Sequence, residues 1–230
     1  MYMNFKYVRE DLEKQIKKEF PKFEIIDKRD SKLMKLLAKI LFFNKTFMTS
    51  YITVIGSKVY VPKLPWKKTN PFGAISVLSH EWVHMKDGKR LGFMFKFLYL
   101  FPQILAPLAL LGFWNPWYFL FALCALPLPA PWRTKFELRG YTISMAVSWW
   151  LLDRRPDFDF YAKQFVGPAY YWMYPFEDYI RERLEEEFER IRADRLEPHE
   201  KHIKMFFLEK FNTIYYNGAR KINNGINYFS

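Results

Sequence analysis

The feature that most constrains the fold is a run of 34 residues, Phe97 to Ala130, that contains no Asp, Glu, Lys or Arg. Two apolar helices of about 17 residues fit into such a run, which is the lower limit for crossing a bilayer. Asn115 and Pro116 near its middle favour a turn. The run therefore predicts a hydrophobic helical hairpin, with residues 91–132 as the inserted segment.

The flanks of this segment favour contact with lipid. Basic residues precede it at Lys86, Lys89, Arg90 and Lys96 and follow it at Arg133, Lys135 and Arg139. Because Lys and Arg accumulate on the cytoplasmic side of membrane segments, both ends are expected on that side. Trp114 and Trp117 at the tip and Trp132 at the base suit interface aromatics. A spanning hairpin, a re-entrant or interfacial hairpin, and a soluble protein in which the hairpin packs over the catalytic helix all stay open.

The composition narrows the class of partner. The chain has 230 residues, enough for one domain with a core, and a formal charge of +12. That charge would attract nucleic acid, an anionic membrane or acidic substrates, but no zinc-finger spacing, Gly-rich phosphate loop or RNP-like run is present. The composition therefore favours membrane lipid over nucleic acid, and we expect no nucleic acid as partner. A peptide or protein substrate is expected from the motif described next. Cys124 is the only cysteine, which excludes an internal disulfide and suits a reducing compartment.

A metal-binding motif, "HEWVH", lies at residues 80 to 84. Asn70 can cap a helix that has Pro71 at its first position and continues into this motif. Two histidines four apart on a helix point the same way, so His80 and His84 can bind one zinc ion. Glu81 then lies where a carboxylate can take a proton from a water molecule at the metal.

A catalytic zinc needs a third protein ligand, and Glu137 is the candidate. The compact metzincin spacing would put a histidine at position 90, which is Arg90, and the next carboxylate after Asp87 is Glu137. The competing interpretation makes Glu137 a surface residue paired with Arg133 or another nearby basic residue. The later histidines, His199 and His202, follow a proline in a charged region, and we expect them in a solvated turn.

Periodicity and turn signals predict the remaining elements. A helix over Val8 to Phe20 and a short strand in "KFEII" come first, and Ser31 then caps a helix with a Lys-rich, solvated face. The Lys-rich face of this helix, with Lys32, Lys35 and Lys39, is expected to be solvated, and contact with a lipid surface is the alternative. A β-hairpin is expected over Phe47 to Val61, turning at Gly56. Helices are expected over Thr134 to Leu152 and Asp178 to Arg195. Thr134, Glu137 and Tyr141 share one face of the first of these two helices.

The order of hairpin strands, "HEWVH" helix, hydrophobic hairpin and glutamate helix resembles the zincin metallopeptidases of the gluzincin type. The nearest layout is that of the CAAX-prenyl endoprotease and HtpX family, and the resemblance covers about Phe47 to Leu152. It implies His80, His84 and Glu137 as zinc ligands and Glu81 as the general base. The family usually has an aspartate four residues after the glutamate, where this chain has Tyr141. Either the Tyr141 hydroxyl or another residue would then support a histidine ligand.

The resemblance also implies that an edge strand binds the peptide substrate, and residues around Tyr51 to Ile55 could supply it. A hydroxyl of Tyr170, Tyr171 or Tyr174 could stabilise the oxyanion, although core or interface packing is the alternative for these tyrosines. Tyr141 completes the expected catalytic residues beside Glu81.

The sequence thus predicts an α+β fold, a zincin-like core with a small antiparallel sheet and the inserted hairpin. Residues 1–230 form a single domain, with 91–132 as the insertion and 176–230 as a charged helical C-terminal region. The expected function is that of a Zn²⁺-dependent endopeptidase, membrane-associated with its active site on the cytoplasmic side, or cytoplasmic if the hairpin is buried. The first residues lack the apolar core of a signal peptide, which agrees with a cytoplasmic N-terminal part. Two alternatives are a non-catalytic protein with structural zinc and a membrane-surface adaptor.

Overall fold

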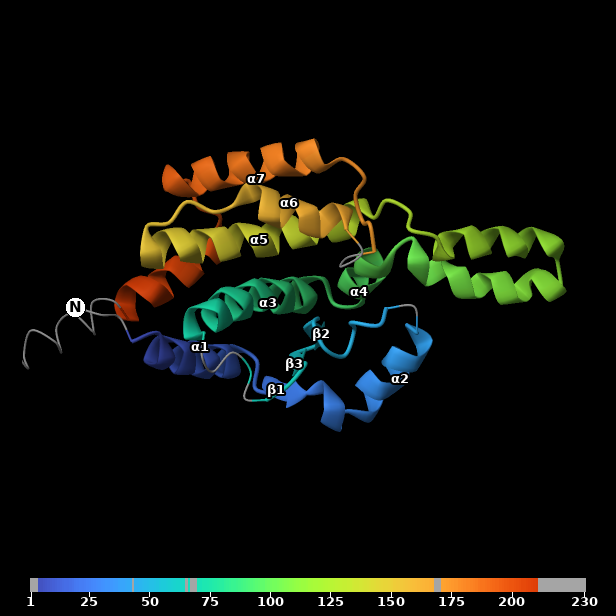
Figure 1. Cartoon of the computed structure of the whole chain (residues 1–230), viewed down its shortest axis with the longest axis horizontal. Coiled ribbons are helices and arrows are strands. Elements are labelled where there is room, and N and C mark those ends of the chain that lie inside the picture. Colours follow the sequence, from blue (N-terminus) through green and yellow to red (C-terminus); the bar gives the residue numbers. More distant parts are fainter. Residues whose placement is uncertain (1–3, 43, 65, 67–69, 168–170, 211–230) are drawn as a thin grey trace, which may run out of the picture.

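The computed structural model describes residues 4–42, 44–64, 66, 70–167 and 171–210. Helix α3 (Pro71–Leu91) lies in the middle of the body (Figure 1). On one side lie α1 (Phe5–Glu19), the small sheet and α2 (Lys32–Ile40), and on the other α5 (Pro131–Leu152), α6 (Phe158–Val166) and α7 (Glu177–Arg192). The body is mostly helical with one small sheet, which confirms the α+β class. The zincin-like core stays a prediction.

Two apolar clusters hold these layers together. One joins α1 to α3 through side chains such as Leu12, Ile16 and Leu78, and the other packs α5 against α6 and α7. Helix α5 contributes to both, with Ile143 in the first cluster and Met145 in the second. The layers therefore share α5, which is also the helix expected to carry Glu137.

The sheet contains β1 (Glu24–Asp27), β3 (Lys58–Val61) and β2 (Thr53–Ile55), in that spatial order. The β2–β3 pair is the expected antiparallel hairpin, although residues 47–50 form turns rather than strand. Strand β1 pairs with β3 in parallel, so the sheet is mixed. The predicted antiparallel arrangement is correct for the β2–β3 hairpin and wrong for β1. A parallel pair needs a crossover, and the chain supplies it through the 3-10 turn Lys28–Asp30 and α2.

Helix boundaries follow the expected caps. The Asn70 side chain accepts a hydrogen bond from the Gly73 N–H at 2.9 Å, and Ser31 caps α2 in the same way. Helix α5 begins at Pro131, before the expected Thr134, because a proline is well suited to the first turn. Residues 198–210 are helical, so the solvated turn predicted around His199 was wrong.

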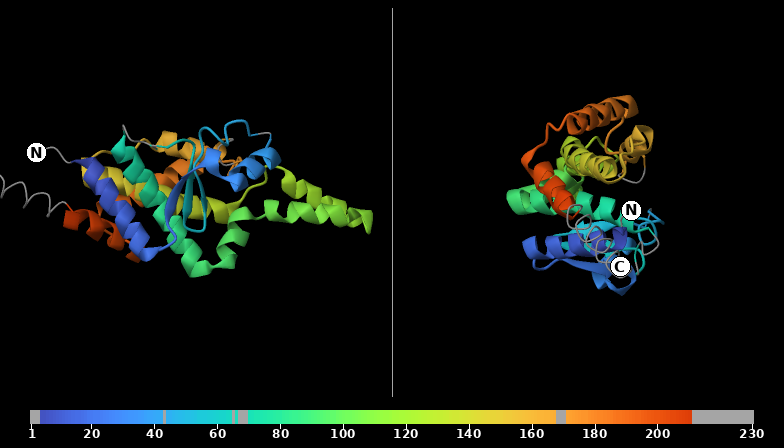
Figure 2. Two further views of the ribbon diagram at one scale, coloured as in Figure 1. Left: turned by 90° about the horizontal axis from the view of Figure 1, so that it is seen from below. Right: turned by 90° about the vertical axis from the view of Figure 1, so that its left-hand side faces the viewer.

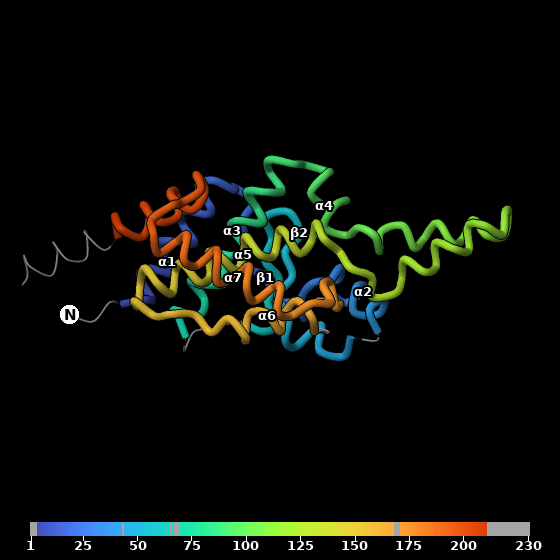
Figure 3. Tube along the Cα trace, turned by 90° about the horizontal axis from the view of Figure 1, so that it is seen from above, coloured from blue at the N-terminus to red at the C-terminus, as the bar shows by residue number. Residues whose placement is uncertain are grey.

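The hydrophobic hairpin divides into two parts. Helix α4 (Phe93–Leu100) packs on α5, because its Phe95 ring lies 4.8 Å from that of Phe136. The 3-10 helices η2 (Gln103–Phe113) and η3 (Pro116–Ala125) pack on each other and extend out of the body as an arm (Figures 1 and 3). The break at Asn115 is confirmed, but the projecting part is shorter than 91–132. The arm does not cover α3, which carries the "HEWVH" motif, so the alternative of a hairpin packed over that helix is wrong for the arm.

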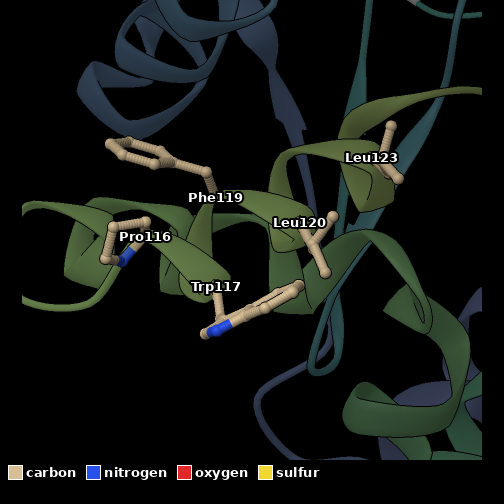
Figure 4. Close-up of a pocket in the computed structure, with 5 residues that line it drawn as sticks. All are labelled: Pro116, Trp117, Phe119, Leu120 and Leu123. Carbon is tan, nitrogen blue, oxygen red and sulfur yellow. The ribbon is translucent and has the colours of Figure 1, made fainter.

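The arm exposes large apolar side chains. Trp114 is 89% exposed and Trp117 76%, and Figure 4 shows Trp117 with its neighbours Phe119, Leu120 and Leu123 on η3. Among the described residues no single helix is long and apolar enough to span a membrane. Phe93–Leu100 and Gln103–Phe113, bent by 78° at their junction, meet the length and composition criteria only as a pair.

Candidate metal centre

Helix α3 presents both histidines of the motif to one point. The Nε2 atoms of His80 and His84 lie 2.9 Å apart, one turn from each other. The side chains are buried, with 6% and 8% of their residue surface exposed. The predicted pairing of the two imidazoles is therefore confirmed.

Glu137 on α5 completes the group. Its Oε2 lies 3.2 Å from His80 Nε2, and its Oε1 lies 3.5 Å from His84 Nε2. The three ligand atoms all lie within 4.8 Å of one another. Two ligands at 2.0–2.1 Å from a tetrahedral zinc lie about 3.3 Å apart, so this spacing fits such an ion. Glu137 is 1% exposed, which contradicts its interpretation as a surface residue.

The close approach of α5 to the histidines depends on Gly140. A Cβ atom built on this glycine would lie 2.6 Å from the imidazole of His80, too close for any side chain. Gly140 follows Glu137 by three residues and therefore shares its helix face. The sequence analysis missed this residue, although its spacing from Glu137 was the signal that could have found it.

Tyr99 on α4 covers the site from a third helix. Its hydroxyl donates a hydrogen bond of 2.5 Å to Glu137 Oε1, and its ring lies 6.1 Å from that of His84. Arg133 Nε donates to the Tyr99 carbonyl at 2.8 Å, so Arg133 holds Tyr99 instead of pairing with Glu137 as the competing interpretation expected. Glu137 Oε2, on the side of His80, accepts no hydrogen bond from the described residues. Tyr99 therefore occupies one carboxylate oxygen and leaves the other for a metal.

The charges of the group are strongly coupled. Burial raises the pKa of the Glu137 carboxyl, but the charge of His84 and the contacts with both imidazoles outweigh burial and hold this pKa well below its ordinary value. For His84, burial lowers the pKa of the imidazole, while Glu137 and the other nearby carboxylates raise it to about 9. Protons and a metal ion compete for the same atoms, so metal binding would release protons.

Glu81 lies beside the group and is partly exposed. Burial raises the pKa of its carboxyl above the ordinary value, and the nearby Glu137 acts in the same direction against the charges of His80 and His84. The Glu81 carboxylate makes no hydrogen bond to another residue in the described part of the chain. A carboxylate of raised basicity next to three ligand atoms is placed to accept a proton.

Tyr141 approaches the site through its ring. The ring meets the His80 imidazole edge to face at 4.8 Å and packs against Tyr161 and Phe165 on its other side. Its position beside a histidine agrees with the expected place, while the catalytic or supporting role of its hydroxyl stays a prediction. His84 Nδ1 is buried and has no hydrogen-bond partner among the described residues.

A second polar cluster lies one turn beyond His84. Asp87 is 2% exposed and forms an ion pair with Arg139 on α5, with 3.1 Å between Asp87 Oδ1 and Arg139 Nη1. An Nη atom of Arg139 also lies 3.3 Å from His199 Nδ1. His202 packs its ring against Trp82 at 5.4 Å. Neither of the later histidines joins the metal-ligand group, as expected, although both lie on a helix.

The remaining predicted residues lie elsewhere. The Tyr171 hydroxyl donates to the carbonyl of Ala125 at the base of the arm, and Tyr174 packs against Phe176 and Tyr179. These contacts agree with the packing alternative, and Tyr170 lies outside the described residues. Thr53 to Ile55 form an edge strand, as expected for residues around Tyr51 to Ile55, while peptide binding there stays a prediction.

Comparison of the chain with protein-family models, with curated proteins and with solved structures finds no match. The geometry of the site is therefore the basis for its functional interpretation. That geometry includes two residues that the sequence analysis missed, Gly140 and Tyr99. No pattern in the sequence connects Tyr99 to Glu137, because they meet only through the packing of α4 on α5.

Proposed function

We propose that the chain is a zinc-dependent endopeptidase associated with a membrane. One observation carries the proposal: the candidate ligand atoms of His80, His84 and Glu137 lie within 4.8 Å of one another. Glu81 directly follows His80 on the same helix. Two imidazoles and one carboxylate are the ligand set of several catalytic zinc sites, which keep a further position open.

Each residue has a distinct part in this proposal. His80, His84 and Glu137 would hold the metal, which when bound polarises a carbonyl and lowers the pKa of water. Glu81 would take the proton of the attacking water on its carboxylate and deliver it to the amine that leaves. The raised pKa of Glu81 favours holding that proton between the two steps.

The substrate and the location follow from two exposed features. Strand β2 is a sheet edge, where an extended peptide can add as a further strand. The arm exposes Trp114 and Trp117, and large exposed apolar surfaces mark contact with a partner or a membrane. We propose that the arm enters the bilayer, with the metal centre on the cytoplasmic side.

One observation favours a second candidate, a non-catalytic protein in which zinc braces α3 against α5. The three ligand residues are all less than 9% exposed, and structural zinc sites are closed. The partly exposed Glu81 is the feature that separates the two candidates.

The test is the zinc content of the purified chain together with hydrolysis of a fluorescent unfolded protein. We expect about one zinc per chain, a marked loss in Glu137→Ala, and no loss in Glu182→Ala, a control on the exposed face of α7. Glu81→Gln should keep the zinc and lose about 10²–10⁴-fold in hydrolysis.

Three results would change the conclusion. Zinc without hydrolysis in the unmodified chain would favour the structural role. Equal hydrolysis by Glu81→Gln and the unmodified chain would reject the general base. Absence of zinc even after its addition would exclude both candidates and leave a membrane-surface adaptor.

A further inference from the structure

Helix α2 has three different faces. The first packs on the body, where Met34 is fully buried beside Phe47 and Tyr60. The second is apolar and exposed, with Leu33 at 42%, Leu36 at 55% and Ile40 at 59%. Because these three residues are spaced by three and four, they form one stripe along the helix. No contact with the described part of the chain explains why this stripe is apolar.

The third face is basic. It consists of Lys32, Lys35 and Lys39, all of which are exposed. None of these lysines forms an ion pair with a residue in the described ranges. The basic and apolar stripes adjoin each other, and together they are called the α2 surface, composed of Lys32, Leu33, Lys35, Leu36, Lys39 and Ile40.

The sequence around α2 strengthens its positive charge. From Ser31 to His80 the chain contains eight lysines and no Asp or Glu. This part of the sequence therefore supplies no carboxylate of its own. Lys58 pairs with Glu24 of β1 at 3.5 Å, whereas Lys32, Lys35 and Lys39 on α2 have no ion pair with a described residue. Such a surface attracts anionic partners.

The position of α2 limits the kind of partner. Figures 1 and 2 show α2 at the end of the body from which the arm leaves. The arm and α2 thus lie at the same end of the molecule. A flat, extended partner could contact both, because they belong to the same end.

We infer that the α2 surface binds an anionic lipid bilayer, with its lysines at the headgroups and Leu33, Leu36 and Ile40 at the boundary with the acyl chains. Helices with adjacent basic and apolar stripes bind in this interfacial position. Nucleic acid would leave the leucines without an apolar partner, and lysine is depleted in protein–protein interfaces. The inference rests on the membrane part of the proposed function and is independent of peptide hydrolysis.

Binding of the full chain to sedimented vesicles tests the charge. Vesicles of phosphatidylcholine with phosphatidylserine are compared with pure phosphatidylcholine. Replacing Lys32, Lys35 and Lys39 by Gln should weaken binding to the anionic vesicles about 100-fold, since each lysine near such a surface contributes about fivefold. The control replaces Lys6, Lys14 and Lys17, three exposed lysines on one face of α1, and removes the same charge. Equal losses in both variants would show a general effect of net charge and overturn the inference.

A fluorescent probe tests whether α2 itself enters the interface. Cys124 is the only cysteine, so Cys124→Ser allows one label at a chosen position. An environment-sensitive dye on Leu36→Cys should shift to the blue with anionic vesicles, and the same dye on Lys17→Cys should not. A dye at position 36 that stays in water while the chain sediments would assign binding to the arm alone and overturn the inference. Failure of both dye shift and sedimentation would reject the membrane proposal as a whole.

Discussion

The candidate metal centre buries ionisable side chains, whereas the arm exposes apolar ones. In the metal centre, His80, His84 and Glu137 are buried between helices, where ionisable groups are rare. In the arm, Trp114 and Trp117 are mostly exposed, where large apolar groups are rarely gathered. One region has buried polar groups, and the other has exposed apolar groups.

Both regions depart from what the stability of the folded chain alone would favour. The buried groups satisfy one another only in part, because Glu137 Oε2 and His84 Nδ1 lack hydrogen bonds from described residues. The arm gains little from its own folding, since its largest side chains stay in solvent. The proposed function would account for both departures, with a metal ion at the buried group and a bilayer around the arm. Departures from ordinary folding rules concentrate at functional sites.

Two tryptophans give the largest expected difference in stability. Trp82 is fully buried beside the metal ligands, and its Nε1 donates to Glu19 at 2.8 Å. Trp82→Ala should lower the free energy of unfolding by about 3–5 kcal/mol, whereas Trp114→Ala should change it by less than about 0.5 kcal/mol. Chemical denaturation of both variants measures the difference. A large loss for Trp114→Ala would mean that the arm packs on the body, and the comparison would fail.

Two glycines test the packing of α5 on the site. Gly140→Ala places a Cβ against the His80 ring and should destabilise the fold by about 1–3 kcal/mol and weaken zinc binding. Gly88→Ala on α3 is the control, because its Cβ would lie 3.6 Å from Phe95, an ordinary contact. That variant should be neutral or up to about 1 kcal/mol more stable. Zinc affinity unchanged by Gly140→Ala would contradict the close approach.

His199 offers a buried histidine outside the metal centre. Burial, and then the charges of Arg139 and other basic residues, lower its pKa to about 4. Between about pH 6.5 and about pH 4, His199 therefore binds a proton in the unfolded chain but not in the folded chain. Stability should fall by about 2 kcal/mol as the pH decreases across this window, after allowance for solvent screening. His199→Gln should remove that part of the slope in unfolding curves, and an unchanged slope would assign it to other groups.

Replacement of Tyr99 gives the smallest expected effect. This residue links the metal centre to the arm, because it lies on α4, which leads into the arm. Tyr99→Phe keeps the ring contact with His84 and removes only the hydrogen bond to Glu137. Zinc affinity should fall about tenfold, as for other groups that orient a metal ligand. Cobalt substitution should also show a changed visible spectrum, because Glu137 could then bind through both oxygens. Tyr118→Phe on the arm is the control and should leave affinity and spectrum unchanged.

Local features were predictable from the sequence where all the residues that determine them lie within one helix or turn. The caps at Ser31 and Asn70, the break at Asn115 and the pairing of His80 with His84 all depend on residues a few positions apart. The parallel pairing of β1 was not predictable in this way, because it depends on how α2 returns the chain to the sheet. The helix around His199 was not predictable either, because Pro198 and the neighbouring charged residues resemble those of a turn.

The sequence by itself determined that one helix presents two imidazoles and a neighbouring carboxylate, because helical periodicity fixes which side chains share a face. It also determined a long apolar segment with a turn at its middle. Only the tertiary structure decided that Glu137 meets the histidines, that Gly140 makes room for His80, and that Tyr99 hydrogen bonds to the carboxylate. It likewise decided that the arm leaves the body instead of covering α3. These outcomes depend on how helices that are distant in the sequence pack together, and this packing is set by contacts across the whole fold instead of by the pattern within one helix.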